Sequence, residues 1–309
     1  MKNIILIGRG AVGAVYAVPL AAMAAKAITP ISFRIAVDAE RLTKYQATPF
    51  AFNGTQQNFD YFTPTQNDPK ADLIIITTKW SGYTQALSTV APLVGPQTTI
   101  LPLLNGLAPY ALAAERWGED RVLRGFYLGH TASRDKAGQA WQDGSYFTNF
   151  GQETNNQPYT ARVEMVSQIF DAAGIKYKIP ENMLGAAWQK LVVNIGTNLP
   201  TGLYRYNYGQ LKASPRAMAL SVALMQEAQR VAVALDVPSA ATLVDNAMRT
   251  FDILQASDYS SMAQDTIAGR ATEIDIFAGE IIRLGREKSI PTPHTSAFYD
   301  DFMALGVKA

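Results

Sequence analysis

Residues 4–16 read IILIGRGAVGAVY, a short apolar run that passes into a glycine-rich turn and then into a helix-like stretch. Gly8, Gly10 and Gly13 have the spacing G-x-G-x-x-G. The first glycine of this spacing permits a tight turn, the second lets the backbone approach a pyrophosphate, and the third allows close helix packing. The helix N-terminus offers unpaired N–H donors and partial positive charge. The stretch therefore predicts a dinucleotide-binding turn made of Gly8, Arg9, Gly10, Ala11, Val12 and Gly13.

The first half of the chain alternates β-type and helical stretches, which favours this interpretation over an ordinary glycine-containing turn. Strands are predicted at 3–7, 31–37, 73–77, 98–103 and 121–127, and helices at 11–25, 82–94 and 109–117. Such alternation implies parallel strands joined by crossover helices. A polar stretch at 134–158 predicts antiparallel strands at the end of the sheet, before a helix at 162–173 and a strand at 175–179. We expect a Rossmann domain over residues 1–180.

The second half has a different pattern, with long apolar periodicities of helical type and no convincing strand. Helices are predicted near 181–196, 207–212, 214–235, 239–254, 269–288 and 293–305. With 309 residues the chain exceeds the comfortable size of one hydrophobic core, which also favours two domains. The predicted fold class is an α/β Rossmann domain followed by an all-α domain over residues 181–309, which would bind substrate and form a dimer.

The composition excludes several classes of function. Lys plus Arg number 27 against 26 Asp plus Glu, and no basic cluster is interleaved with aromatic residues, so nucleic acid is not an expected partner. The absence of Cys excludes disulfides and thiolate metal sites, and the 2 His leave little for metal binding. No uncharged apolar run approaches the roughly 20 residues that span a bilayer. We expect a cytoplasmic protein without a metal or a membrane partner.

The adenosine end of the dinucleotide is expected near the end of the second predicted strand, in ISFRIAVDAER at 31–41. A Rossmann domain that binds NAD usually has an acidic residue there, whereas one that binds NADP often has an Arg. Asp38 favours NAD, because its charge would repel a 2′-phosphate. Arg41 could reach such a phosphate, so these residues leave the choice between NADP and NAD open.

A polar stripe follows the first predicted helix of the second domain. In WQKLVVNIGTN at 188–198, Lys190, Asn194 and Asn198 recur every four residues and so share one helical face. A solvated face is the ordinary explanation of such a stripe. This helix, however, is apolar over most of its circumference, with side chains such as Trp188. We therefore expect the stripe to face a cleft.

The stripe suits the reduction of a ketone by hydride from a nicotinamide. That reaction develops negative charge on the oxygen, which needs a hydrogen-bond donor and finally a proton. Lys190 can supply both, and partial burial would lower its pKa towards the working pH. The two Asn side chains could orient a hydroxyl or a carboxylate of the substrate.

Taken together, these features resemble the 2-dehydropantoate 2-reductases, or ketopantoate reductases, over nearly the whole chain. The resemblance rests on GRGAVG at 8–13, TTK ending at Lys79, LNG containing Asn105, KLVVNIGTN at 190–198, SSMAQD and TEID within 260–275, and the GREKSIPTP that follows. It implies a Rossmann domain and a helical domain like the C-terminal one of 6-phosphogluconate dehydrogenase. It also implies NADPH-dependent reduction of ketopantoate to (R)-pantoate in pantothenate synthesis.

The resemblance assigns roles to the residues that match the family's motifs. Lys190 would be the general acid, and Asn194, Asn198 and Ser261 would bind the substrate's hydroxyl and carboxylate. Glu273 would lie near the ribose and the catalytic lysine, and so counts as both catalytic and cofactor-binding.

The same resemblance places two further residues at the cofactor. Asn105 would lie between nicotinamide and substrate and contact both. Lys79, after the third predicted strand, would lie beside the cofactor. NADP is the family's coenzyme, and NAD is kept as the alternative because of Asp38.

The chain departs from the family's pattern at several positions. Leu104 stands where Gln is usual, Tyr208 takes the place expected for an Asn while Asn207 is one position off, and His294 stands where Asn is common. His130, after a strand of the first domain, is expected to be structural. These departures bear on the substrate and the coenzyme rather than on the fold.

The expected function is therefore NAD(P)H-dependent reduction of a small branched 2-oxo acid, most simply ketopantoate, in a cleft between the two domains. The alternatives are a related 2-hydroxy-acid or opine-type dehydrogenase with another substrate, and a non-catalytic dinucleotide-binding sensor. The expected partners are a small 2-oxo acid and a second copy of the chain in a homodimer.

Overall fold

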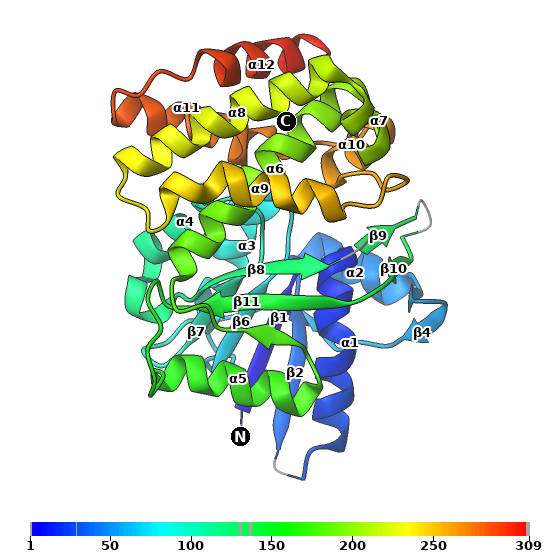
Figure 1. Cartoon of the computed structure of the whole chain (residues 1–309). Helices are drawn as coiled ribbons and strands as arrows, with labels where there is room; N and C mark the ends of the chain where they lie inside the picture. Colours follow the sequence, from blue (N-terminus) through cyan, green and yellow to red (C-terminus); the bar gives the residue numbers. More distant parts are fainter. Residues whose placement is uncertain (1, 29, 130–131, 136–137, 307–309) are drawn as a thin grey trace. The chain divides into compact units, whose positions relative to one another are not determined.

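The structure is a computed structural model that describes residues 2–28, 30–129, 132–135 and 138–306 (Figure 1). His130, expected to be structural, lies outside these residues. The chain forms two compact units. The first unit comprises Met1–Leu104 and Pro109–Met183, and the second, which we call the helical unit, comprises Asn105–Ala108 and Leu184–Ala309.

The first unit is built on a five-stranded parallel sheet in the order β5-β2-β1-β6-β7. The strands are β1 (Lys2–Ile7), β2 (Ile31–Ala36), β5 (Tyr61–Phe62), β6 (Leu73–Ile76) and β7 (Thr99–Pro102). Ile4, Ile5 and Leu6 of β1 are all buried, although successive residues of a strand point to opposite faces. Both faces of the sheet are therefore covered, as a continuous apolar strand requires, and the predicted parallel sheet is confirmed.

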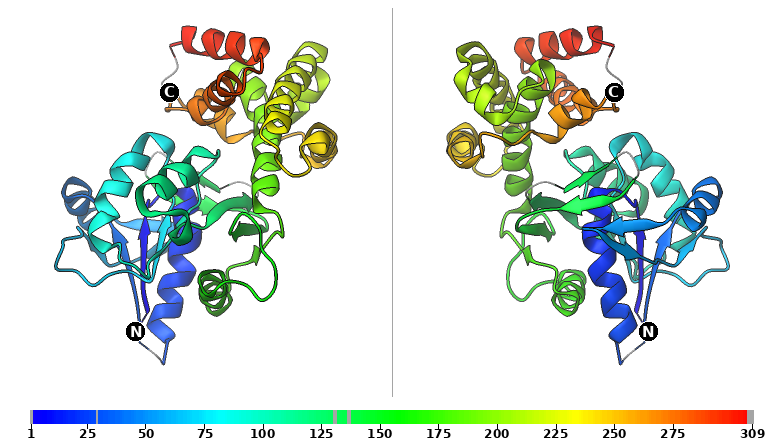
Figure 2. Two further views of the ribbon diagram at one scale, coloured as in Figure 1. Left: turned by 90° about the vertical axis from the view of Figure 1, so that its left-hand side faces the viewer. Right: turned by 90° about the vertical axis from the view of Figure 1, so that its right-hand side faces the viewer.

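Helices cover the two faces of this sheet. On one face, α1 (Ala11–Lys26) and α5 (Ala161–Ala173) share a core with the side chains of Ile4 and Leu6. Figure 2 shows α1 running alongside β1. On the other face, α3 (Tyr83–Val90) and α4 (Ala108–Trp117) pack against Ile5 and Ile7. The remaining helical segments of this unit are α2 (Ala39–Ala47), η1 (Trp80–Gly82), η2 (Ala91–Leu93) and η3 (Glu119–Arg121).

The later strands of the first unit form two further sheets. β8 (Arg124–Gly129) pairs antiparallel with β11 (Tyr146–Gly151), which pairs parallel with β12 (Tyr177–Lys178). A bridge between Ile100 and Val122 connects β7 to the start of this sheet. The other sheet has the order β4-β3-β10-β9 and consists of β3 (Phe50–Phe52), β4 (Thr55–Gln57), β9 (Ala132–Arg134) and β10 (Ala140–Gln142). The antiparallel strands predicted at 134–158 were expected to complete the main sheet. They belong instead to two separate sheets.

The helical unit has no strand within its described residues, which confirms the predicted all-α class. Its elements are α6 (Met183–Tyr204), α7 (Tyr208–Ala213), α8 (Pro215–Ala234), η4 (Ala240–Thr242), α9 (Leu243–Ile253), α10 (Ser261–Ile267), η5 (Ile274–Ile276), α11 (Ala278–Glu287) and α12 (Pro293–Ala304). No helix in the described part of the chain is both long and apolar enough to cross a membrane.

Two predicted helix boundaries in this unit are wrong. The helix predicted to end at 196 continues to Tyr204 through Pro200. The helix predicted at 269–288 begins at Ala278, because Gly269 adopts a left-handed conformation (φ +65°) after α10, and 274–276 form a separate 3₁₀ turn. α10 itself was not predicted.

A buried carboxylate caps the last helix. Glu227 of α8 is fully buried, and its side chain accepts hydrogen bonds from the backbone N–H groups of His294 (2.9 Å) and Thr295 (2.8 Å) and from Thr295 Oγ1 (2.7 Å). These donors lie in the first turn of α12, whose N–H groups have no partner within the helix. Glu227 therefore ties α12 to α8, and His294 takes part through its backbone.

Replacing Glu227 with Ala should lower the free energy of unfolding by about 3 kcal/mol, because it leaves several buried donors unpaired. Glu227→Gln should cost less, since its amide oxygen still accepts. Urea denaturation measures both effects, and Gln226→Ala at the neighbouring exposed position is the control. Equal stability of Glu227→Ala and the control would show that the cap contributes nothing.

Candidate active site

The glycine turn joins β1 to α1 in the first unit. A Cβ atom at Gly13 would lie 1.8 Å from the carbonyl oxygen of Gly8, and one at Gly8 (φ +111°) would lie 2.6 Å from the Thr77 carbonyl carbon. A Cβ at Gly10, by contrast, would have no neighbour within 4 Å. The first and third glycines therefore serve chain packing, and the second leaves the backbone open to a ligand.

The donors at this turn fit a pyrophosphate. α1 begins at Ala11, and its first turn has no side-chain cap and no acidic residue in the structure as described. Its N–H groups therefore keep their hydrogen-bonding capacity and the partial positive charge of a helix N-terminus. β1 lies between β2 and β6, at the point where the strand order reverses. Parallel α/β sheets bind their ligands at such a point.

The end of β6 lies next to the same turn. Thr77 Oγ1 donates a hydrogen bond to the carbonyl oxygen of Gly8 (2.8 Å). Thr78 Oγ1 is buried without a hydrogen-bond partner among the described residues. Lys79 follows directly and is exposed. The TTK stretch therefore brings a hydroxyl and an ammonium to the carboxyl end of β6, next to the glycine turn at the carboxyl end of β1.

The Arg9 side chain is directed into an aromatic cluster. Its guanidinium carbon lies 3.7 Å from the ring centre of Tyr45 and 4.7 Å from that of Phe50. Its NH1 group donates to the hydroxyl of Tyr61 (2.8 Å). The side chain of Arg9 is thus engaged within the first unit, and its backbone is what the turn can offer to a coenzyme.

Asp38, predicted to lie at the adenosine end of the coenzyme, has a structural partner in Arg41. It follows β2 and is the N-cap of α2, where its Oδ1 accepts from the backbone N–H of Arg41 (2.8 Å). Its other oxygen pairs with the Arg41 guanidinium. The two side chains that favoured opposite coenzymes in the sequence are therefore paired with each other.

Lys190, Asn105 and Glu273 form a hydrogen-bonded chain within the helical unit. Lys190 Nζ donates to Asn105 Oδ1 (2.8 Å), and Asn105 Nδ2 donates to Glu273 Oε2 (2.8 Å). Lys190 belongs to α6, Glu273 precedes η5, and Asn105 comes from the short segment Asn105–Ala108. The amide of Asn105 has both ends engaged, so its orientation is fixed, as is that of the ammonium.

The environment makes Lys190 a stronger acid than an exposed lysine. Burial lowers its pKa from 10.5 to about 8, and the negative charge of Glu273 acts in the opposite direction. Near neutral pH the ammonium is therefore mostly protonated and still able to give up a proton. This is the property that a general acid needs.

The rest of the polar stripe lies on the same helix. Asn198 Nδ2 donates to Ser261 Oγ (3.2 Å), which joins α6 to the first residue of α10. Asn194, between Lys190 and Asn198 on α6, makes no side-chain hydrogen bond within the described residues and is half-buried. The helical unit thus places an ammonium and two carboxamides along one face of α6, with a hydroxyl of α10 hydrogen-bonded to the last of them.

The structure also explains the positions where the chain departs from the family's pattern. Leu104 is buried in the core of the first unit. Asn207 is the N-cap of α7, where it accepts from the backbone N–H of Gln210 (2.7 Å) in a capping box. Tyr208 is the first residue of that helix. The Asn207 side-chain oxygen is therefore engaged in capping, and Leu104 and Tyr208 carry no amide side chain.

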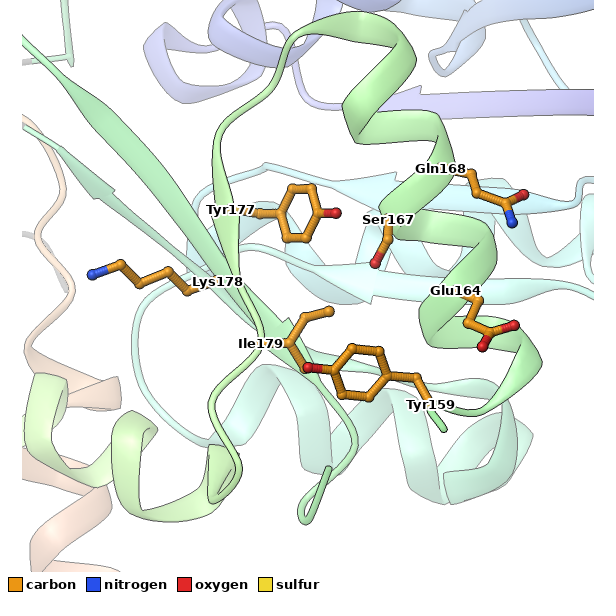
Figure 3. A pocket seen from close by; sticks show the side chains of 7 residues that line it. All are labelled: Tyr159, Glu164, Ser167, Gln168, Tyr177, Lys178 and Ile179. Carbon is orange, nitrogen blue, oxygen red and sulfur yellow. The ribbon is translucent and has the colours of Figure 1, made fainter. Parts of the chain in front are cut away.

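Two further observations concern other kinds of site in the described part of the chain. They contain no cluster of three or more His, Asp or Glu that could hold a metal ion. A groove of about 560 Å³ lies between α5 and β12 (Figure 3). It is lined by Tyr159, Glu164, Ser167, Gln168, Tyr177, Lys178 and Ile179, and so includes none of the predicted site residues.

A dinucleotide turn on a parallel sheet and a lysine–amide–carboxylate chain in a helical unit are features of an oxidoreductase. The family description "Ketopantoate reductase PanE/ApbA" matches residues 4–155, and its C-terminal counterpart matches residues 182–305. The chain belongs to the ketopantoate reductase family and is an oxidoreductase that acts on CH–OH groups. Membership of this enzyme family argues against the alternative of a non-catalytic sensor.

Curated relatives agree with this membership. The 2-dehydropantoate 2-reductase of Vibrio cholerae is 27% identical over 306 residues, which cover 98% of this chain and 97% of the relative. The enzyme of the same name from Halobacterium salinarum is 30% identical over 226 residues, 72% of each chain.

Solved structures show the same fold. D-mandelate dehydrogenase with NADH and anilino(oxo)acetate has a TM-score of 0.85 at 21% identity, and covers 99% of this chain and 100% of its own. A dimeric ketopantoate reductase from Staphylococcus aureus has a TM-score of 0.75 at 20% identity, with 98% of both chains covered.

Proposed function

We propose that this protein reduces a small branched 2-oxo acid, namely ketopantoate, to its 2-hydroxy acid with a nicotinamide coenzyme. The observation that carries the proposal is the hydrogen-bonded chain of Lys190, Asn105 and Glu273. It holds an acidified ammonium in one orientation within a unit whose family reduces this kind of ketone.

The residues of the helical unit would act on the substrate as follows. The bound coenzyme supplies the hydride. Lys190 donates a hydrogen bond to the ketone oxygen, stabilises the negative charge that develops there and then transfers its proton. Glu273, through Asn105, keeps the ammonium aimed. Asn194, Asn198 and Ser261 would bind the hydroxyl and carboxylate of the substrate.

The first unit would bind the coenzyme. The N–H groups at Gly10, Ala11 and Val12 would receive the pyrophosphate, and Lys79 would lie beside it. Asp38 would meet the adenosine ribose. We propose NADP as the coenzyme from family membership and keep NAD as the alternative, because the carboxylate of Asp38 would repel a 2′-phosphate bound next to it.

The test is the oxidation of NADPH and of NADH, followed by absorbance, with ketopantoate and a panel of other 2-oxo acids. The panel should include 2-oxo-3-methylbutanoate and 2-oxo-2-phenylacetate, a branched and an aromatic acid. We expect turnover that is fastest with ketopantoate. No turnover on any acid would contradict the proposed reaction, whereas faster turnover of another acid would contradict the substrate alone.

A second candidate is the reduction of another 2-oxo acid, as in a related hydroxy-acid or opine-type dehydrogenase. Leu104 is buried where the family usually has Gln, and the side chain of Asn207 is occupied by capping α7. The amide of the expected Gln is therefore missing, and the amide oxygen of Asn207 is already engaged in the capping box. The panel of acids decides between the two candidates.

We also propose a homodimer, as in the Staphylococcus aureus relative. Apolar side chains on the helical unit support it, since Ile253 of α9 and Ile267 of α10 are 75% and 54% exposed. Light scattering of the purified protein tests it, and a mass of one chain at micromolar concentration would contradict it.

Replacing Asp38 with Asn should raise the preference for NADPH over NADH, measured as the ratio of the two kcat/KM values, by about tenfold. Asn is as good an N-cap as Asp, so α2 keeps its cap while the repelling charge is removed and the Arg41 guanidinium is released. Glu40→Gln, at the next acidic residue, is the control for a general effect of charge. An equal shift in the control would show that Asp38 does not contact the ribose.

A further inference from the structure

The segment Asn105–Ala108 is held against residues 273–280 of the helical unit at three successive positions. Asn105 Nδ2 donates to Glu273, as described above. A Cβ atom at Gly106 would lie 2.9 Å from the carbonyl oxygen of Ile276. The backbone N–H of Leu107 donates to Glu280 Oε2 (3.0 Å). The first three residues of the segment thus contact residues 273, 276 and 280, which are spaced three and four positions apart.

Glu280 is an unusual residue for its surroundings. It lies in the first turn of α11 and is 5% exposed, while its neighbours Phe277, Ala278 and Ile281 are all fully buried. Burying a carboxylate is unfavourable unless hydrogen bonds compensate for the lost water. The helix N-terminus favours the negative charge. Arg283 lies 3.8 Å away but is half-exposed, so this ion pair contributes little.

The segment needs an anchor of this kind because of Gly106. Its φ of +79° is a conformation that glycine adopts without strain, and glycine also reaches many others. The tight contact with Ile276 excludes a side chain at this position. The residue that allows the turn therefore cannot make it rigid, and the orientation of Asn105 depends on what holds the backbone after the glycine.

We propose that Glu280 is a positioning residue for the reaction. By accepting the Leu107 N–H it fixes the backbone beyond Gly106, and so keeps the Asn105 amide between Lys190 and Glu273. In this role it acts through Asn105. The inference rests on the proposed function, because Asn105 matters to catalysis through Lys190.

The test compares two variants of nearly equal side-chain volume. Glu280→Gln keeps an oxygen that can accept the Leu107 N–H, whereas Glu280→Met does not. Glu287→Met, at the exposed end of the same helix, is the matched control. Three properties are measured: kcat and KM on the preferred acid, the exchange rate of the Asn105 side-chain amide protons by NMR, and the melting temperature.

We expect Glu280→Met to lower kcat by about 10- to 100-fold, the usual size for a misplaced catalytic group, with the coenzyme KM within twofold of wild type. Its Asn105 amide protons should exchange at least about tenfold faster, because the anchor of the segment is lost. Glu280→Gln and Glu287→Met should stay within about threefold of wild type in both properties. Recovery in the Gln variant separates positioning from a general loss of stability.

Two outcomes would overturn the inference. One is a kcat of Glu280→Met within twofold of wild type in a folded protein whose Asn105 amide exchanges faster. The other is an equal loss of kcat in the Gln and Met variants, which would mean that the charge of Glu280 acts rather than its hydrogen bond. If the wild-type protein reduces no 2-oxo acid, the proposed function fails, and unchanged Asn105 exchange in Glu280→Met would overturn the anchoring separately.

Discussion

Replacement of Lys190 by Ala should lower kcat by a factor on the order of 10² to 10⁴, which is the usual effect of removing a general acid. The variant loses the group that donates to the developing oxyanion and delivers its proton. Steady-state or stopped-flow kinetics, in which the oxidation of the preferred coenzyme is followed by absorbance, measure kcat. Lys288→Ala, at an exposed lysine that follows α11, is the control and should leave kcat unchanged.

The pH dependence of the wild-type enzyme gives an independent test of the same residue. The folded-state pKa of Lys190 is lowered to about 8, so the ammonium is present below that pH and lost above it. In the direction of reduction, kcat/KM should therefore be constant below pH 8 and fall tenfold per unit above it. Oxidation of the hydroxy acid should show the opposite trend. An unchanged kcat in Lys190→Ala, or a flat profile through pH 8, would remove Lys190 from its role.

The glycine turn leads to the second large effect. Gly10→Ala should raise the coenzyme dissociation constant by at least about tenfold, because its methyl group would occupy the space into which the pyrophosphate must come. The melting temperature should stay within about 2 °C of wild type, since that methyl group meets no protein atom within 4 Å. Fluorescence titration with NADPH and with NADH measures the binding.

Gly13→Ala is the matched comparison, with the same added methyl group three residues away. That group would lie 1.8 Å from the Gly8 oxygen, so the variant should lose about 3 kcal/mol or more of stability. Substitution of Gly10 is thus expected to weaken coenzyme binding, and substitution of Gly13 to lower the stability of the fold. Wild-type coenzyme affinity in Gly10→Ala would show that the dinucleotide binds elsewhere.

The elements of the first unit that could be predicted are those whose burial is visible as a run of apolar residues in the local sequence. β1 and β6 are continuous apolar runs because both faces of the sheet are covered, and such runs are visible in the sequence. β3, β4 and β5 are two or three residues long, too short for any periodicity, and they form because neighbouring strands offer them partners.

The course of α6 shows the same limit in the helical unit. Pro200 lacks the N–H that a helix needs and would ordinarily end it. Here Thr201 Oγ1 donates to the carbonyl of Thr197 (2.6 Å) and is also hydrogen-bonded to Ser260 (2.6 Å). The hydrogen bond to Ser260, 59 residues further along, is a tertiary contact that ties this part of α6 to the N-cap of α10, and nothing in the local sequence reveals it.

The candidate site divides in a similar way. The shared face of Lys190, Asn194 and Asn198 follows from helical periodicity alone. The position of Asn105 in the helical unit does not follow from the sequence. Asn105 comes directly after a predicted strand of the first unit, and its hydrogen bond to Lys190 joins residues that are 85 positions apart. Glu280 was missed altogether. Its signal is an acid set among Phe277, Ala278 and Ile281, on a helical stripe that is otherwise apolar.

The membership of Asn105–Ala108 in the helical unit limits how this protein can be taken apart or recombined. The chain passes between the units at Leu104–Asn105, at Ala108–Pro109 and again at Met183–Leu184. A fragment that starts at Leu184 would carry Lys190 and Glu273 without the amide that links them. A chimera that takes its first unit from another dehydrogenase must therefore keep residues 105–108 of this protein together with its helical unit. A single fusion joint at Met183–Leu184 would replace these four residues with those of the other dehydrogenase.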